Sequence, residues 1–310
     1  MLKMDVLTSL EDLHRYMHKV NDIFPVEALL QQPFGKEQIT RYYKNSSPGY
    51  RFFHSREGAV HMALNYDGIY HKAGFLAHIK EISQLIEKMH PTKVLELGSG
   101  KGFNSAELAR RHPQVHFQGI DITPAHLSIS QHNGKHLPNL RFSYGDYHNI
   151  DFEDNSFDLI FELESICHAT NHEQVLKNIF AKLKPGGLFI SFEGFRMCNF
   201  DNLSEELQKA ARLTEKSMAV DRSPQIDDWM LTAKKVGFQT ISQEDISFAI
   251  MPNLARFQRM ARAYFKYPFL AKSFLLFLSR DMLLNAIAGL LMPFTIYHKA
   301  QGYFKIVLQK

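Results

Sequence analysis

The chain has 310 residues, of which 45% are hydrophobic and 22% are charged, a composition that indicates a globular protein and excludes a disordered one. Its formal net charge is only +4, so charge does not indicate a nucleic-acid-binding surface. The two cysteines, Cys167 and Cys198, provide no disulfide framework, and no signal-peptide core follows the first methionine, so we expect a cytoplasmic protein.

Residues 1–80 are predicted to form a helical cap over the ligand site of the following domain. In the first part of this segment, apolar side chains recur at helical spacing: Leu7, Leu10, Leu13, Met17 and Val20. Residues 41–75 are rich in aromatic and basic side chains but show no clean periodicity. Their tyrosines include Tyr50, Tyr66 and Tyr70, for which contact with a substrate and simple packing both remain open.

A glycine-rich turn follows the first predicted strand, residues 93–97, and leads into a predicted helix at 103–112. The turn has the pattern E-x-G-x-G-x-G, formed by Glu96, Gly98, Gly100 and Gly102. Glycine lets the backbone bend sharply and a ligand approach closely, and the helix that follows presents free N–H groups to that ligand. A dinucleotide-binding turn, G-x-G-x-x-G, would need its third glycine at Phe103, so the spacing argues against NAD.

Acidic residues follow two later strands at the same edge of the predicted sheet. Asp121 ends the strand 116–121, where it is expected to hold a ribose diol. Asp146 follows the strand 140–145, where it could accept a hydrogen bond from an adenine amino group. Glu96 would repel a pyrophosphate but attract a cationic amino acid. An adenosine with a positively charged amino-acid tail therefore fits all three positions.

This ordered set of residues resembles that of the class I S-adenosylmethionine (SAM)-dependent methyltransferases. The resemblance implies SAM as the cofactor and a SAM-binding methyltransferase domain over residues 81–310. The alternative is a Rossmann-type protein that binds NAD or no nucleotide. The residues expected to bind the cofactor are Glu96, Gly98, Ser99, Gly100, Gly102, Asp121, Ile122, Asp146 and Tyr147.

Apolar strands alternate with helices through this domain. The predicted strands are 93–97, 116–121, 140–145, 157–163, 187–193, 239–248 and 303–308. The predicted helices are 75–90, 103–112, 124–134, 172–183, 201–217 and 226–236. Such alternation predicts an α/β fold with a Rossmann-like, seven-stranded, doubly wound parallel sheet, whose ligands bind at the carboxyl ends of the strands.

The loop after the fourth strand carries the residues expected to face the methyl acceptor. Its sequence, Glu164-Ser165-Ile166-Cys167-His168-Ala169, resembles the Glu-Ala-Thr-Cys-His-Ala motif of sterol C-methyltransferases. The fifth strand ends in Phe192-Glu193-Gly194-Phe195, where that family has Tyr-Glu-Trp, so the tryptophan is absent here. The resemblance covers about residues 75–200 and implies C-methylation of an alkene in a hydrophobic isoprenoid or sterol-like lipid, through a carbocation.

That chemistry suits the residue types in the loop. Aromatic faces stabilise a carbocation, and a carboxylate, Glu164 or Glu193, adds charge stabilisation in a dry pocket. Either glutamate or His168 could then accept a proton, although His168 could instead cap the following helix or contact the cofactor. The residues expected to contact the hydrophobic substrate are Tyr50, Tyr66, Tyr70 and Phe195.

A helical insertion is predicted at about residues 250–299, before the last strand. Its first part, 254–266, is a basic amphipathic helix, which suits an anionic membrane surface, an acidic ligand or a solvated face. The rest is very apolar but is interrupted by Lys272 and Arg280, so it is too broken to span a membrane. A lid over the substrate, a shallow peripheral contact with a membrane and a packed helical hairpin all remain open.

Three other functions are also considered. A prenyl diphosphate C-methyltransferase would bind a diphosphate and Mg²⁺, for which Arg51, His54 and Arg56 are candidates. An O- or N-methyltransferase of a polar metabolite would use His168 as a base, and a SAM-binding module would lack catalysis. No metal site is predicted, because the histidines are scattered without ligand spacing. The oligomeric state is not predicted.

Overall fold

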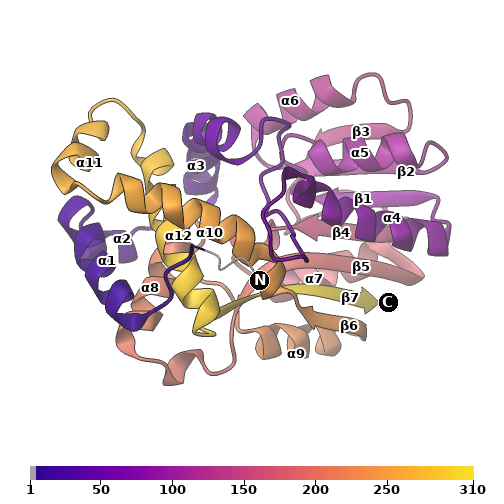
Figure 1. Ribbon diagram of the computed structural model, residues 1–310. Coiled ribbons are helices and arrows are strands. Elements are labelled where there is room, and N and C mark those ends of the chain that lie inside the picture. Colours follow the sequence, from indigo (N-terminus) through magenta and orange to yellow (C-terminus); the bar gives the residue numbers. More distant parts are fainter. Residues whose placement is uncertain (1–4) are drawn as a thin grey trace.

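A single seven-stranded sheet forms the centre of the protein, for which a computed structural model describes residues 5–310 (Figure 1). The first four residues of the predicted cap lie outside the described residues. The strand order is β3-β2-β1-β4-β5-β7-β6. The strands are β1 (Lys93–Leu97), β2 (His116–Asp121), β3 (Leu140–Tyr144), β4 (Phe157–Leu163), β5 (Leu183–Arg196), β6 (Gln239–Asp245) and β7 (Gln301–Gln309).

The direction of the last strand differs from the predicted all-parallel sheet. Strands β1 to β5 pair in parallel, whereas β7 lies antiparallel between β5 and β6. The α/β fold with seven strands is therefore confirmed, but β7 is reversed. The apolar run of β7 could not reveal this, because it is buried along most of its length and such burial reports no direction.

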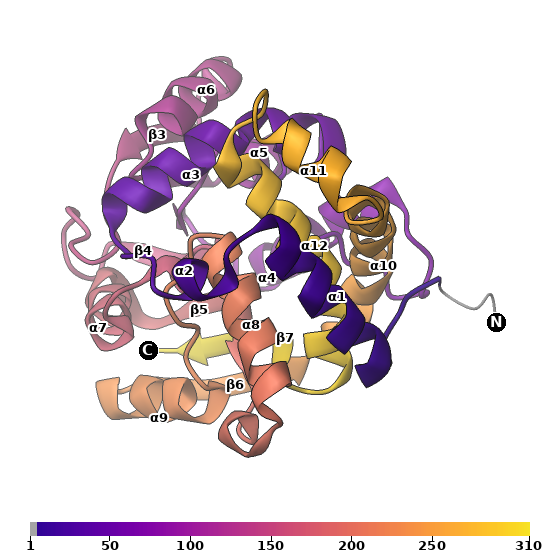
Figure 2. The ribbon, with the colours of Figure 1, turned by 90° about the vertical axis from the view of Figure 1, so that its left-hand side faces the viewer.

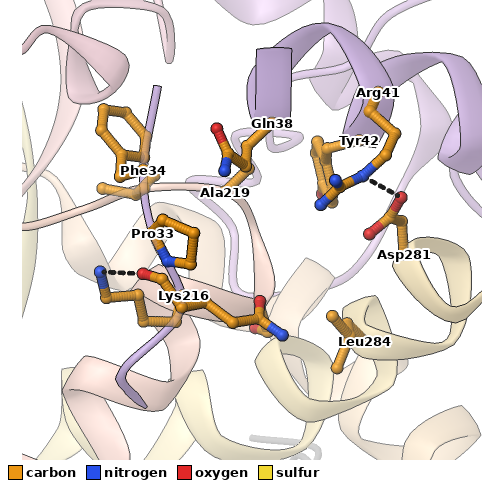
Figure 3. A pocket seen from close by; sticks show the side chains of 12 residues that line it. Pro33, Phe34, Gln38, Arg41, Tyr42, Lys216, Ala219, Asp281 and Leu284 are labelled. Carbon is orange, nitrogen blue, oxygen red and sulfur yellow. Dashed lines mark hydrogen bonds and ion pairs between the residues drawn. The ribbon is translucent and has the colours of Figure 1, made fainter. Parts of the chain in front are cut away.

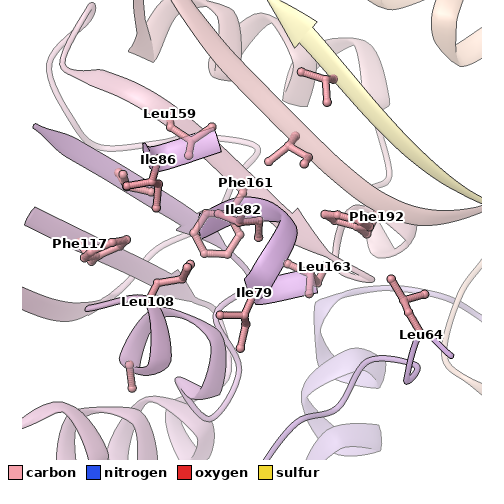
Figure 4. Packing of buried hydrophobic residues seen from close by; sticks show 14 of the residues in the cluster. Leu64, Ile79, Ile82, Ile86, Leu108, Phe117, Leu159, Phe161, Leu163 and Phe192 are labelled. Atoms are coloured by element: carbon pink, nitrogen blue, oxygen red, sulfur yellow. The ribbon is translucent and has the colours of Figure 1, made fainter. Parts of the chain in front are cut away.

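Alternate side chains of each central strand pack on opposite faces of the sheet. On one face, Val94 and Phe161 pack with Ile79 and Ile82 of α4 (Ala77–Met89) (Figure 4). On the other face, Leu95 packs in a second cluster with residues of α7 and α9. The remaining helices of the cofactor domain are α5 (Phe103–Arg111), α6 (Pro124–Gly134), α7 (His172–Lys182) and α9 (Ile226–Val236).

The other helices gather at the end of the sheet where the parallel strands terminate (Figures 1 and 2). They are α1 (Leu10–Ile23), α2 (Val26–Leu30), α3 (Lys36–Gly49), α8 (Glu205–Ser217), α10 (Ser247–Tyr264), α11 (Pro268–Phe274) and α12 (Arg280–Tyr297). Leu13 and Phe24 share one apolar cluster with Leu213 and Leu290. One core therefore joins the predicted cap to α8 and to the predicted insertion.

Helix α3 covers the first part, residues 41–49, of the segment 41–75 that shows no clean periodicity. It buries Ile39, Tyr42 and Ser46, which are spaced at helical intervals, but tyrosines and lysines on its other faces hide that pattern. A single π-helical turn follows at Tyr50–His54. Within residues 5–310, no helix has the length and apolar character needed to cross a membrane.

Candidate active site

A cavity of about 520 Å³, including its open mouth, lies where β1, β2 and β4 end. The loops after these strands form its floor, and Ile39 and Tyr43 of α3 form part of its cover. Of the residues predicted to act in catalysis or cofactor binding, the cavity brings together Gly98, Gly100, Asp121, Ile122, Tyr147, Glu164 and His168.

The glycine turn requires glycine on conformational and steric grounds. Gly98, Gly100 and Gly102 have φ angles of +64°, +52° and +81°, in the left-handed region that other residues rarely adopt. A Cβ atom at Gly98 would lie 1.8 Å from Oγ of Ser165. The turn therefore packs directly against the loop that follows β4.

The carboxylate of Asp121, at the end of β2, is held against this turn. Asp121 accepts hydrogen bonds from the backbone N–H of Gly100 (2.8 Å) and of Thr123 (2.7 Å), which hold its carboxylate at the cavity wall. The hydroxyl of Ser99 is buried and has no hydrogen-bond partner among the described residues. The open backbone of the turn and the fixed Asp121 carboxylate fit the ribose hydroxyl groups of an adenosine cofactor. Ser99 does not line the cavity, so its predicted contact with the cofactor stays a prediction.

Glu96 does not line this cavity. Its carboxylate accepts hydrogen bonds from the side chain of Asn104 (3.0 Å) and from the backbone N–H of Ser105 (3.2 Å), in the first turn of α5. Burial raises the pKa of Glu96 to about 7. The direct role of Glu96 in the structure is thus to hold the helix N-terminus that faces the turn, and its predicted contact with the cofactor stays a prediction.

The carboxylate of Asp146 is bound by a residue of the N-terminal cap. It forms an ion pair with Lys36 of α3 and accepts a hydrogen bond from the backbone N–H of His148 (2.9 Å). Its neighbours Gly145 and Tyr147 line the cavity, but Asp146 itself does not. A nucleobase that bound to Asp146 would therefore have to share it with Lys36, or displace Lys36.

Glu164 is the carboxylate that faces the cavity from the acceptor loop. Its φ angle is +49°, an unusual value for a residue with a side chain, and such strain is concentrated at functional sites. The carboxylate accepts hydrogen bonds from the backbone N–H of Met62 (2.6 Å) and the hydroxyl of Tyr303 (2.8 Å). Burial raises its pKa to about 7, so it is partly ionised at neutral pH.

Glu193, the other predicted carboxylate, does not line the cavity. It is buried and accepts hydrogen bonds from the backbone N–H groups of Cys167 (2.9 Å) and Gly194 (2.7 Å). Burial and the neighbouring charges of Glu162 and Glu164 raise its pKa well above the usual range. Its position indicates a brace for the acceptor loop.

His168 is held by hydrogen bonds at both ring nitrogens. Nδ1 lies 2.9 Å from the carbonyl oxygen of Ala219, and Nε2 lies 2.8 Å from the hydroxyl of Tyr43. Burial lowers its pKa to about 4, so the ring is neutral at physiological pH. The neutral ring therefore donates from Nδ1, and Nε2 accepts from Tyr43.

The predicted substrate residues are not brought together. Tyr50 stacks on Tyr43 with ring centroids 6.3 Å apart, next to the cavity. The other three do not line the cavity, and their contact with a substrate stays a prediction. Tyr66 is exposed and donates to Glu81, Tyr70 lies beneath the guanidinium of Arg256, and Phe195 packs against Trp229 and Phe304.

Three further residues lie at this site and were not predicted from the sequence: Tyr43, Met62 and Tyr303. Tyr43 lies in the aromatic segment that was singled out, but no pattern distinguished it from its neighbours. Met62 and Tyr303 contact Glu164 across 102 and 139 positions of the sequence, and no local pattern could have revealed these contacts.

A second cavity of about 390 Å³ lies between α3, α8 and α12 (Figure 3). Its charged groups already have partners, because Arg41 pairs with Asp281 (3.4 Å) and Lys216 lies 3.5 Å from the carbonyl oxygen of Gln32. None of the predicted site residues lines it.

Comparison with known proteins shows which family the sequence resembles. The family described as "Methyltransferase domain" matches residues 89–237. The chain is 29% identical to the sterol 24-C-methyltransferase erg-4 of Neurospora crassa, over 50% of this chain and 41% of that protein. It is also 29% identical to the 24-methylenesterol C-methyltransferase 2 of Arabidopsis thaliana, over 61% and 53%. The chain thus spans about half the length of these relatives.

Solved structures share the fold at low sequence identity. The cyclopropane synthase MmaA2 of Mycobacterium tuberculosis matches with a TM-score of 0.71 and 13% identity, over 90% of this chain and all of that one. The geranyl diphosphate C-methyltransferase of Streptomyces coelicolor A3(2) matches with a TM-score of 0.62 and 11% identity, over 90% and 98%. The predicted domain type and cofactor are confirmed by the family match. The chain therefore contains a class I SAM-dependent methyltransferase domain, which implies SAM as its cofactor, and it is a distant homologue of the sterol 24-C-methyltransferases.

Proposed function

We propose that the protein methylates an alkene carbon of a hydrophobic isoprenoid or sterol-like acceptor, with SAM as the methyl donor. The observation that carries this proposal is Glu164, a carboxylate with a pKa of about 7 at the wall of the cofactor cavity. The curated relatives are named as sterol C-methyltransferases, which supports the acceptor class.

When bound, SAM supplies an electrophilic methyl group. The alkene π electrons would form a bond to that methyl carbon while the methyl–sulfur bond breaks and its electron pair stays on sulfur, which would leave a positive charge on the neighbouring acceptor carbon. We infer that the ring faces of Tyr43 and Tyr50 and the Glu164 carboxylate stabilise this charge. The acceptor then loses a proton to an oxygen of Glu164, and its C–H electron pair restores a double bond.

The other predicted catalytic residues receive supporting roles in this proposal. His168 accepts a hydrogen bond from the hydroxyl of Tyr43. It therefore positions the Tyr43 ring at the cavity and does not itself take the acceptor's proton. Glu193 accepts hydrogen bonds from two backbone N–H groups, and these bonds fix the loop that carries Glu164. Both are proposed as positioning residues.

Replacing Tyr303 by phenylalanine tests the environment of Glu164. The variant removes a hydroxyl that donates to the carboxylate and that lowers its pKa. We therefore expect a higher Glu164 pKa, a rising limb of the kcat profile that moves to higher pH, and a kcat at pH 7 about tenfold lower. A purely structural role for Tyr303 would lower kcat equally at all pH values. The measurement is kcat from pH 6 to 9.

A prenyl diphosphate acceptor is the second candidate, and one observation favours it. The Lys101 ammonium has a lowered pKa because of burial and the nearby charge of Arg51, so two cations lie close together beside the glycine turn. His54, by contrast, lies 2.7 Å from the carbonyl oxygen of His61 and stacks on Phe257. A diphosphate with Mg²⁺ would thus rely on Arg51 and Lys101, without His54.

Transfer of labelled methyl from SAM to a mixed acceptor panel distinguishes these functions. The panel contains sterols, linear triterpenes, prenyl diphosphates and polar amines, and products are partitioned between organic solvent and water. Label in the organic phase before phosphatase treatment supports a neutral lipid acceptor. Label that enters it only after phosphatase indicates a prenyl diphosphate. Transfer only to water-soluble hydroxyls or amines would overturn both proposals in favour of an O- or N-methyltransferase.

A further inference from the structure

The segment Lys266–Arg280, here called the apolar tip, exposes an unusual set of large apolar side chains. It leads from α10 through α11 to α12 and projects at the upper edge of the helical end (Figure 2). Phe269, Leu276 and Phe277 are 84%, 79% and 82% exposed. Tyr267, Leu270, Phe274 and Leu278 of the same segment are also exposed. Single exposed apolar residues are common, but a contiguous set marks an interaction surface.

The backbone of the apolar tip is folded. Ala271 is buried, and its carbonyl accepts a hydrogen bond from the hydroxyl of Tyr264 (3.1 Å). Just before the tip, Phe265 is buried against Phe24 of α1. The N–H of Leu278 donates to the carbonyl of Phe274 (2.9 Å). The apolar side chains are therefore displayed outward by an ordered turn anchored on the cap.

The charged residues in the stretch 246–280, which contains the apolar tip, are all basic. No Asp or Glu occurs between Asp245 and Asp281, whereas six basic residues do: Arg256, Arg259, Arg262, Lys266, Lys272 and Arg280. The three within the tip are exposed. The neighbouring acids are already paired, Asp281 with Arg41 and Asp5 with Arg262. The apolar tip thus exposes both large apolar side chains and basic side chains.

We propose that the apolar tip docks on the surface of an anionic phospholipid bilayer. Its aromatic and leucine side chains enter the boundary between headgroups and acyl chains, and Lys266, Lys272 and Arg280 contact the lipid phosphates. A second copy of the chain is a poorer occupant, because a symmetric contact would bring two sets of cations together without acids to receive them. Within the segment 250–299, for which a peripheral membrane contact was predicted, the proposal assigns that contact to residues 266–280.

The apolar tip is connected to the cover of the cofactor cavity. Ser279 donates from its hydroxyl to the carbonyl of Asn45 (3.0 Å), and the Asn45 side chain donates to Asp281 (2.8 Å). Asn45 lies on α3, the helix that carries Tyr43 into the cavity. Docking would therefore hold the cavity cover at the lipid surface, whatever the acceptor proves to be.

Co-flotation of the full chain with lipid vesicles tests the proposal. Vesicles of phosphatidylcholine alone are compared with vesicles that also contain phosphatidylserine. The test variant is Phe269→Ser/Leu276→Ser/Phe277→Ser. The matched control is Leu231→Ser/Ile241→Ser, which removes exposed apolar side chains from α9 and β6. Circular dichroism and the unfolding temperature establish that both variants are folded.

We expect the wild-type chain and the control to bind the anionic vesicles, and the test variant to bind at least about tenfold more weakly. Charge reversal at Lys266 and Lys272 should weaken binding to anionic vesicles at low salt. The proposal is overturned if the wild-type chain does not float with anionic vesicles or if the test variant floats equally well. It is also overturned if the wild-type chain is a dimer in lipid-free solution and the test variant is a monomer, which would assign the surface to a second copy.

Discussion

Replacing Glu164 by glutamine is expected to lower kcat by about a hundredfold or more, because the amide cannot accept the proton that the acceptor must lose. The carboxylate is the active form, and burial raises its pKa to about 7. Activity of the wild-type protein should therefore rise with pH through about 7, and this limb should be absent from the residual activity of the variant. The dissociation constant for SAM should change little.

Two measurements separate catalysis from folding in this experiment. The folded state holds the Glu164 proton more tightly than the unfolded chain, so the free energy of unfolding should fall as pH rises from about 4.5 towards 7, and less steeply in Glu164→Gln. The companion variant is Glu193→Gln, whose carboxylate braces the loop without lining the cavity. If Glu193→Gln lost the pH limb while Glu164→Gln kept it, the two roles would have to be exchanged.

Replacing Gly98 by alanine is expected to have the largest effect on cofactor binding. The new methyl group would lie 1.8 Å from Oγ and 2.6 Å from Cβ of Ser165, so the turn and the acceptor loop would have to separate. Strain at a φ of +64° adds to this overpacking, for a combined loss of about 3 kcal/mol in the free energy of unfolding. A displacement of the turn should weaken SAM binding by about a hundredfold, measured by calorimetry.

A matched control isolates the steric part of this effect. Gly186 also has a left-handed φ of +78°, but an added Cβ there meets no atom within 4 Å, so Gly186→Ala should lose only about 1 kcal/mol. The double variant Gly98→Ala/Ser165→Gly removes the clashing side chain and should recover stability to the level of Gly186→Ala. Equal destabilisation by the two single variants would refute the clash.

Local sequence patterns predicted the parts of the site that local structure builds. The glycine turn and Asp121 are fixed within single strand–turn–helix units, and both line the cavity. The strand positions follow from apolar runs of ordinary length. The end of β6 was placed three residues late, because the Asp245 side chain accepts from the backbone N–H of Ser247 (3.0 Å) and turns the chain into α10.

Phe195 shows how the length of a strand decides where a side chain lies. The predicted strand covered residues 187–193, and Phe195, near its end, was expected to contact the substrate. Strand β5 instead continues to Arg196, so strict alternation sends Phe195 to the same face as Phe189, where both lie in the second core cluster. The partners of Glu164 were unpredictable for another reason, since they depend on the arrangement of distant elements.

The position of β7 between β5 and β6 has a consequence for the order in which the protein can fold. During synthesis, β6 leaves the ribosome before its sheet neighbour β7, and the three helices α10, α11 and α12 must follow before residues 301–309 arrive. Until then, β5 and β6 present unpaired edges, which favour pairing with other chains. Closing so long a connection is slow. Strand β7 also carries Tyr303, which donates a hydrogen bond to Glu164. A nascent chain that has not yet added β7 therefore keeps its unpaired strand edges and lacks a complete acceptor site.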